Sequence, residues 1–108
     1  MLTSATAVIE RRTEIAGDHV THPYEAGWAS EALFFLQVPV PHPEITVQVQ
    51  TSPDGITWVN RGKARVMHAH TDIIELGLER FGGWLRLALS GPTPESPATI
   101  LVHLAMKG

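Results

Sequence analysis

The sequence contains no cysteine, so none of its 108 residues can form a disulfide, act as a thiol nucleophile or give a thiolate to zinc. Basic residues are few: 8 Lys and Arg stand against 11 Asp and Glu, and no basic cluster indicates nucleic-acid binding. The longest apolar run, residues 32–36, is far shorter than the roughly 20 residues that cross a bilayer, and residues 1–9 lack the features of a signal peptide. We therefore expect neither a nucleic acid nor a membrane as partner.

Length and composition indicate one small domain spanning residues 1–108. With 44% hydrophobic residues the chain can form a core, but a domain of this size buries only about 60 to 70% of the surface of its unfolded chain. No disulfide can add to that stability. Association with other chains would therefore contribute to it.

Alternation of apolar and polar residues is the dominant pattern, and it is typical of half-buried strands. In residues 44–51, Ile45, Val47 and Val49 fall on one face. Residues 30–37 also fit helical spacing, but the prolines that follow and the paired phenylalanines favour a strand. The other expected strands are residues 4–10, 32–38, 57–61, 64–68, 72–79, 84–90 and 97–107.

About eight short strands separated by turn residues predict an all-β fold, an antiparallel two-sheet β-sandwich of jelly-roll-like form. Residues 17–30 have no periodicity and are expected to form a long loop. Residues 1–12 are a possible N-terminal arm that reaches a neighbouring subunit.

A tight hairpin turn is the most informative motif. Pro53 sets φ for the first turn position, Asp54 can accept hydrogen bonds from the following backbone, and Gly55 can adopt a positive φ. Trp58 then returns to the sheet, where we expect it in the core. The predicted structural residues of this hairpin are Ser52, Pro53, Asp54, Gly55 and Trp58.

No arrangement of residues predicts catalysis, a cofactor or a metal site, so we expect a protein that is not an enzyme. His68 and His70 could share one strand face and be joined by His103, but a metal site needs further ligands, and a solvated strand end is the simpler interpretation. No serine lies in a nucleophile-elbow context, and Gly82-Gly83 is too short to cradle a phosphate. The candidate interface residues are Tyr24, Trp28 and Arg86.

Two resemblances follow from the hairpin. With the later segment Trp84-Leu85-Arg86-Leu87, it resembles discoidin-like carbohydrate-binding jelly rolls. Over residues 44–108, including the closing strand from Ala98 to Gly108, the pattern is similar to small β-sandwich structural proteins of tailed phages, such as head-decoration proteins.

The phage resemblance implies a non-enzymatic capsid decoration or cement protein without a cofactor. Such a protein would self-associate, with a trimer favoured, and would bind the major capsid protein or other particle proteins. It would be located in the virion after assembly in the host cytoplasm. The alternative is a carbohydrate-binding jelly-roll module, with a glycan as partner and often a structural calcium. A small metal-dependent enzyme of cupin-like form is a third reading.

Overall fold

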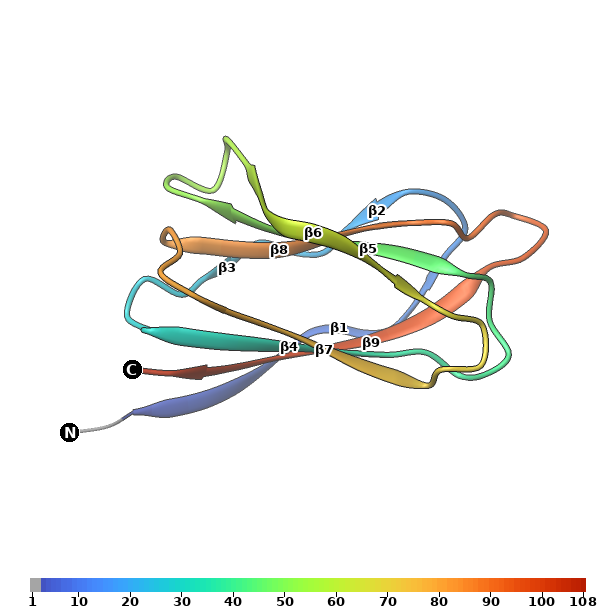
Figure 1. The fold of residues 1–108 in the computed structure, drawn as a ribbon, viewed down its shortest axis with the longest axis horizontal. Coiled ribbons are helices and arrows are strands. Elements are labelled where there is room, and N and C mark those ends of the chain that lie inside the picture. The colour runs from blue at the N-terminus through green and yellow to red at the C-terminus, as the bar shows by residue number, and fades with distance from the viewer. Residues whose placement is uncertain (1–2) are drawn as a thin grey trace.

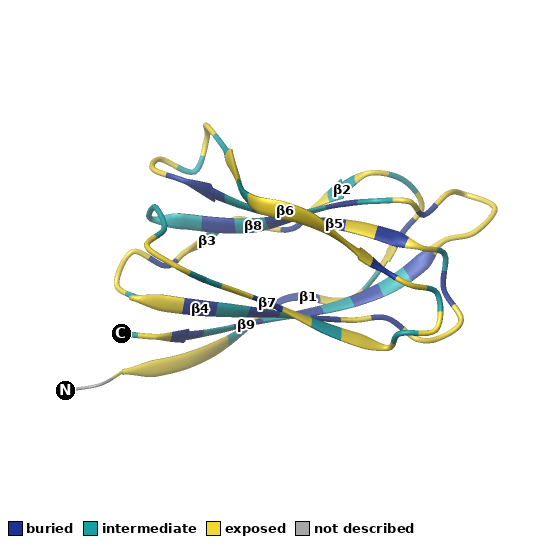
Figure 2. Ribbon diagram, in the orientation of Figure 1, coloured by how far each residue is buried: buried dark blue, intermediate teal, exposed yellow. Residues whose placement is uncertain are grey.

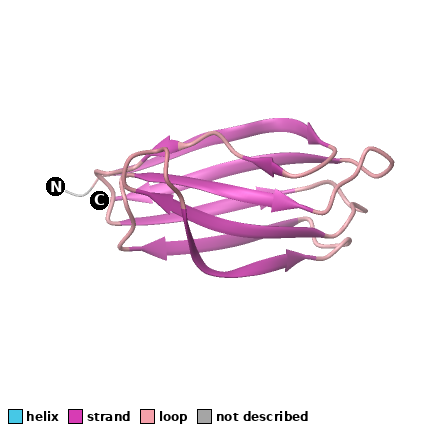
Figure 3. Cartoon of the chain, turned by 90° about the horizontal axis from the view of Figure 1, so that it is seen from above, coloured by secondary structure: helices cyan, strands magenta, loops and turns pink. Residues whose placement is uncertain are grey.

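Nine β-strands in two packed antiparallel sheets make up residues 3–108, the part of the chain that this computed structural model describes (Figure 1). The long axes of the strands follow the long axis of the molecule, and the loops lie at its two ends (Figure 3). No helix in this part of the chain is long and apolar enough to span a membrane. The strands are β1 (Ser4–Ile15), β2 (His19–Val20), β3 (Tyr24–Glu25), β4 (Glu31–Gln37), β5 (Ile45–Ser52), β6 (Val59–Met67), β7 (Ile73–Glu79), β8 (Trp84–Ser90) and β9 (Ala98–Lys107).

The strand order is that of a jelly roll. One sheet, here called sheet A, has the order β1-β9-β4-β7, and sheet B has the order β2-β8-β5-β6, with β3 also paired to β8. When β2 and β3 are counted as one interrupted strand, each sheet has four strands. In both sheets, strands from the first and second halves of the chain alternate, as the two Greek keys of a jelly roll require. The predicted all-β, jelly-roll-like sandwich is confirmed.

The core lies between the sheets and follows the predicted alternation (Figure 2). Each long strand buries every second residue because successive side chains point to opposite faces. Within β9, for example, Ile100, Val102 and Leu104 are fully buried while the residues between them are half-buried. Burial of a side chain of this size stabilises the fold by about 1.5 to 3 kcal/mol. The predicted inward residues of β5, β8 and β9 are all in the core.

One strand replaces two that the sequence pattern predicts. Residues 57–61 and 64–68 were expected as separate strands, but β6 runs through both. Its register against β5 shifts between Val47 and Val49, and Gly62 adopts a φ of 69° near this irregularity. The bulge interrupts the alternation without ending the strand, which is why the pattern suggested a break.

The segment 17–30 contains β2 and β3, each two residues long. Between them, the buried Thr21 continues the pairing with β8 through its side chain: its N–H donates to the Leu87 carbonyl, and its Oγ1 accepts from the Leu87 N–H, both at 2.9 Å. A side-chain hydroxyl thus replaces a backbone acceptor, so the strand can be interrupted without leaving buried groups unpaired. Alternation cannot reveal a strand formed in this way.

Residues 4–12 of the predicted arm lie in β1, which is paired to β9 along its length, while residues 1–2 lie outside the described residues. Two register shifts interrupt the pairing, one between Val8 and Glu10 and one between Glu10 and Thr13. Arg12, in the second, has a φ of 50°. These bulges bend β1, so that its first half runs beside the end of β9 and away from the other sheet (Figure 1).

Candidate functional site

The hairpin between β5 and β6 is held by its own side chains. Asp54 Oδ1 accepts hydrogen bonds from the N–H groups of Ile56 and Thr57, both at 2.9 Å. Ser52 Oγ accepts from the Gly55 N–H at 2.8 Å and donates to Asp54 Oδ1 at 3.0 Å. The hydrogen bonds from Thr57, Ile56 and Ser52, in that order, lower the pKa of Asp54 below its usual value. The side chains of Ser52 and Asp54 are thus both hydrogen-bonded within the turn.

Gly55 lies against the ring of Trp84 on the outer face of sheet B. Its φ is 80°, and a Cβ at this position would lie 3.1 Å from Trp84 Cδ2. A side chain here would be strained by its backbone and crowded by the ring. The hairpin therefore folds back over the sheet and covers one of its tryptophans.

The expectation that Trp58 lies in the core is wrong. Trp58 is half-buried and lies outside the core cluster, and the Arg86 Cζ is 4.2 Å from the centroid of its ring. Arg86 Nε donates to Gln50 Oε1 at 2.7 Å, and Gln50 Nε2 donates to Asn60 Oδ1 at 2.9 Å. Burial lowers the pKa of Arg86. A row of polar and aromatic side chains thus crosses β8, β5 and β6, with a cation–π contact at its end.

The three predicted interface residues do not form one surface. Tyr24 is half-buried and packs against the core, whereas Arg86 belongs to the polar row on sheet B. Trp28 is 44% exposed and lies beside the end of β9, where a Cβ on Gly108 would be 3.0 Å from its ring. Of the three, Trp28 alone is exposed.

The outer face of sheet A carries an apolar patch. The register aligns Leu33 of β4 with Gly77 of β7 and Ala105 of β9, and in the next row aligns Phe35 with His103. We call the following residues the apolar face: Val8, Leu33, Phe35, Leu101 and Ala105. The apolar run of residues 32–36 is divided between the two faces of β4: Phe34 is fully buried, while Leu33 and Phe35 point outward and are half-buried.

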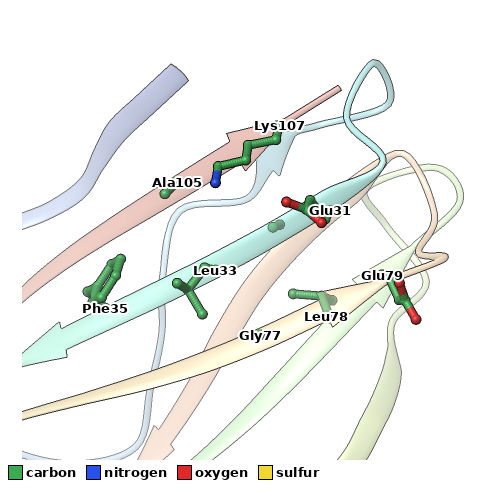
Figure 4. Close-up of a pocket in the computed structure, with 9 residues that line it drawn as sticks. Glu31, Leu33, Phe35, Gly77, Leu78, Glu79, Ala105 and Lys107 are labelled. Atoms are coloured by element: carbon green, nitrogen blue, oxygen red, sulfur yellow. The ribbon is translucent and has the colours of Figure 1, made fainter. Parts of the chain in front are cut away.

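A hollow of about 620 Å³ lies within this patch (Figure 4). Its floor includes Leu33 and Phe35, and it remains open because Gly77 has no side chain. A Cβ on Gly77 would lie 3.3 Å from Leu33 Cδ1. Glu31, Glu79 and Lys107 form a charged rim at one end, with two negative charges and one positive. The hollow can accept an apolar side chain from another molecule.

The histidines singled out in the sequence are not brought together. His68 Nδ1 is 3.3 Å from Glu44 Oε2, with both side chains exposed, whereas His103 lies on the outer face of sheet A, opposite Phe35. Among residues 3–108, no group of three or more His, Asp or Glu side chains could hold a metal ion.

Two buried titratable residues carry no signal in the sequence pattern, and Glu10 is one of them. It is 6% exposed, Thr13 Oγ1 donates to its Oε2 at 2.8 Å, and His19 Nε2 lies 3.1 Å from its Oε1. Burial raises the pKa of Glu10. Hydrogen bonds from Thr13 and His19, together with the charges of His19 and His22, lower it by more than burial raises it, so the pKa lies below its usual value. The contact joins β1 of sheet A to β2 of sheet B.

The second of these residues is His42, which is 6% exposed in the connector between β4 and β5. Its Nδ1 is 2.7 Å from the Pro43 carbonyl oxygen and its Nε2 is 2.7 Å from that of Thr71. The backbone N–H groups of Val38 and His42 also donate across this gap, to the carbonyls of Asp72 and Ala69. His42 thus fastens the connector to the loop between β6 and β7.

Comparison with solved structures supports the fold. The PBSX exported protein XepA superposes with a TM-score of 0.62 at 9% identity, over 98% of this chain and 36% of that one, so the present chain spans about a third of XepA. The SPBc2 prophage-derived protein YomS gives 0.57 at 8% identity, over 100% and 96% of the two chains. The endospore appendages of Bacillus, a family of disulfide-linked pili, give 0.57 at 10% identity, over 98% and 83%.

At these identities the likeness concerns the fold alone. No curated protein matches the sequence. A protein-family model does match it, over residues 40–108, which run from the connector before β5 to the end of β9. That match takes in more than half of the chain and includes the hairpin, the polar row and two of the five residues of the apolar face, Leu101 and Ala105. The chain belongs to the family described as a domain of unknown function, DUF6385.

Proposed function

We propose that the protein is a non-enzymatic structural component of a phage-like particle, a decoration or cement protein that associates with itself and with the capsid lattice. The observation that carries this proposal is the apolar face with its hollow, which no other part of the described chain covers. An exposed apolar patch rimmed by polar residues marks a protein interaction site. Two of the similar folds, XepA and YomS, are by name products of PBSX and SPBc2, and this adds support.

The partner surface can be described by its chemistry. The hollow calls for a protruding apolar side chain, and the rim of Glu31, Glu79 and Lys107 carries a net negative charge, as does the whole chain at −3. A complementary surface would therefore have an apolar centre beside basic residues. We expect this surface on the major capsid protein or on another protein of the particle, and we propose that the protein is located in the virion.

Co-sedimentation with particles that lack the protein tests the proposal. Phe35→Glu places a charge in the apolar face and should weaken particle binding at least about tenfold, because the charge would have to be desolvated on docking. Val66→Glu is the matched control: Val66 is 45% exposed and pairs with Thr46, and it lies on sheet B. If wild-type protein does not sediment with particles, or if the two variants bind equally, the proposal fails.

A carbohydrate-binding role is the second candidate, and the position of Trp58 favours it. Its ring lies outside the core against Arg86, which is hydrogen-bonded to the Gln50 amide, and an aromatic ring with polar neighbours can stack on and hydrogen-bond to a sugar. A glycan array with and without calcium tests this role. Binding that Trp58→Ala abolishes would support it, and the absence of any binding would exclude it.

A further inference from the structure

Within residues 3–108 the two sheets have four edges, and three of them are blocked against further pairing. Unpaired edge strands invite another strand, and proteins prevent this with short strands, charges or bulges. On sheet B, β2 and β3 have two residues each, and β6 carries Arg61, Lys63 and Arg65 beside a bulge.

On sheet A, the edge of β7 is capped by arginines from the opposite sheet. The Arg61 guanidinium donates to the carbonyls of Glu79 and Arg80, each at 2.7 Å, and Arg65 donates to the carbonyl of Glu75. These carbonyl groups are therefore satisfied, and a strand approaching this edge would have to displace two cations.

The fourth edge, residues 4–8 of β1, has no such protection from the part of the chain that the structure describes. Its sequence, Ser-Ala-Thr-Ala-Val, contains no charge and no proline, and its pairing with β9 is regular up to Val8. Four of the five residues are exposed. The bulges and charges of β1 begin only after this segment, so the protection is confined to the second half of the strand.

The hydrogen bonds at the end of β1 identify the free backbone groups. Thr3 and Gly108 exchange two hydrogen bonds, at 3.1 and 2.8 Å. Because bonded and non-bonded pairs alternate along an antiparallel ladder, Ala5 and Ala7 also bond to β9. The N–H and C=O groups of Ser4, Thr6 and Val8 therefore point to the open edge.

We propose that residues 4–8 pair antiparallel with the same segment of a second copy of this chain, with Thr6 opposite Thr6 across a two-fold axis. This register also pairs Ser4 with Val8 of the other copy, so that every free group of the segment is bonded. The proposal deepens the self-association in the proposed function and rests on it. Where the resemblance to phage proteins implied a trimer, this edge fits a dimer.

A second copy is favoured over a different strand for two reasons. The segment is neutral and small, so antiparallel self-pairing brings no like charges together. Val8 is also part of the apolar face, in the same row as His103 and Phe35. Pairing would join sheet A of both copies into one sheet and make their apolar faces continuous, which gives a larger surface for one particle protein.

Light scattering after size-exclusion chromatography of the full chain tests the proposal. We expect a dimer, and we expect Thr6→Pro to shift it to monomer, with dimerisation weakened at least about tenfold. Proline removes an N–H that faces the open edge, and edge strands tolerate it there, so the circular dichroism spectrum and Tm should change little. Thr6→Val keeps the N–H and serves as the control that stays dimeric.

A cysteine substitution provides a second test that does not depend on proline. The chain has no cysteine, so Thr6→Cys introduces its only thiol. The facing Cβ atoms of a hydrogen-bonded antiparallel pair are about 5.5 Å apart, beyond the roughly 3.5 to 4.5 Å of a disulfide but within the span of a short bifunctional thiol reagent. With such a reagent this variant should cross-link at least about tenfold faster than Ile56→Cys, whose site is 81% exposed on the hairpin of sheet B.

The outcomes separate the two proposals. A monomer, a trimer, or equal cross-linking rates of the two cysteine variants would overturn the strand pairing while leaving particle binding to be measured independently. A dimer that dissociates with Thr6→Pro but does not sediment with particles would support the strand pairing and refute the particle role.

Discussion

His42→Ala should destabilise the fold substantially. The imidazole is buried between the carbonyl oxygens of Pro43 and Thr71, each 2.7 Å from a ring nitrogen. A ring N–H donates to at least one of these carbonyls; its loss leaves a buried carbonyl unpaired, which costs about 1 to 3 kcal/mol, and the lost packing of the ring adds about 1 kcal/mol. Because water can reach part of the vacated space, we expect a total loss of about 2 to 4 kcal/mol in the free energy of unfolding.

Urea denaturation followed by tryptophan fluorescence measures this loss, and thermal unfolding provides a second readout. For a domain of this size about 1 kcal/mol corresponds to 4 to 8 °C, so Tm should fall by roughly 8 to 32 °C. His68→Ala is the matched control, because His68 is exposed and its contact with Glu44 is also exposed. It should change stability by less than about 0.5 kcal/mol. A His42→Ala variant as stable as this control would refute the assigned role of the imidazole.

Three further predictions concern other parts of the sandwich. Because folding lowers the pKa of Glu10, the carboxylate stabilises the fold above the pKa of the unfolded chain, about 4.3, and this contribution is lost as pH falls through the folded pKa. In Glu10→Gln the free energy of unfolding should therefore fall less steeply with decreasing pH in this acid range. Gly55→Ala should cost about 1 to 3 kcal/mol in unfolding assays, from its φ of 80° and its crowding against Trp84. Gly77→Val should weaken particle co-sedimentation, because it fills the hollow beside Leu33.

Each of these has an outcome that contradicts it. For Glu10→Gln it is an acid unfolding midpoint unchanged from wild type. Gly62→Ala is the control for Gly55, since Gly62 has a φ of 69° but a Cβ there would meet nothing within 4 Å. Equal losses in these two alanine variants would show that Trp84 contributes nothing to the glycine requirement. Wild-type binding by Gly77→Val would mean that the hollow is not part of the docking surface.

Much of the fold follows from alternation, because a strand with one buried face carries its orientation in its own residues. The inward residues of β5, β8 and β9 could be named in advance, and with the turn residues they indicated a sandwich. Glu10 shows where this reasoning stops: strict alternation would place it on the face opposite Ile9, yet both are buried. The bulge between Val8 and Glu10 turns the carboxylate inward, and no residue in the sequence marks that bulge.

The candidate site was less predictable, because it depends on which strands become neighbours. The hairpin motif correctly located a turn, but the direction in which the chain leaves it decides the face on which Trp58 lies. Trp58 contacts Arg86, which is distant in sequence. The two side chains meet only because β8, β5 and β6 lie in that order in sheet B. Likewise, Leu33 and Phe35 gave no sign of a hollow until Gly77 was placed beside them.

The two bulges of β1 divide the strand into segments with different tolerance to mutation. Residues 9–15 contribute Ile9 and Ile15 to the core, so substitutions there are constrained by folding. Residues 4–8 contribute almost nothing to the core, so substitutions there leave folding intact and are free to follow the demands of a partner. Within one continuous strand, the chain can therefore change what it assembles with while keeping the structure that it folds into.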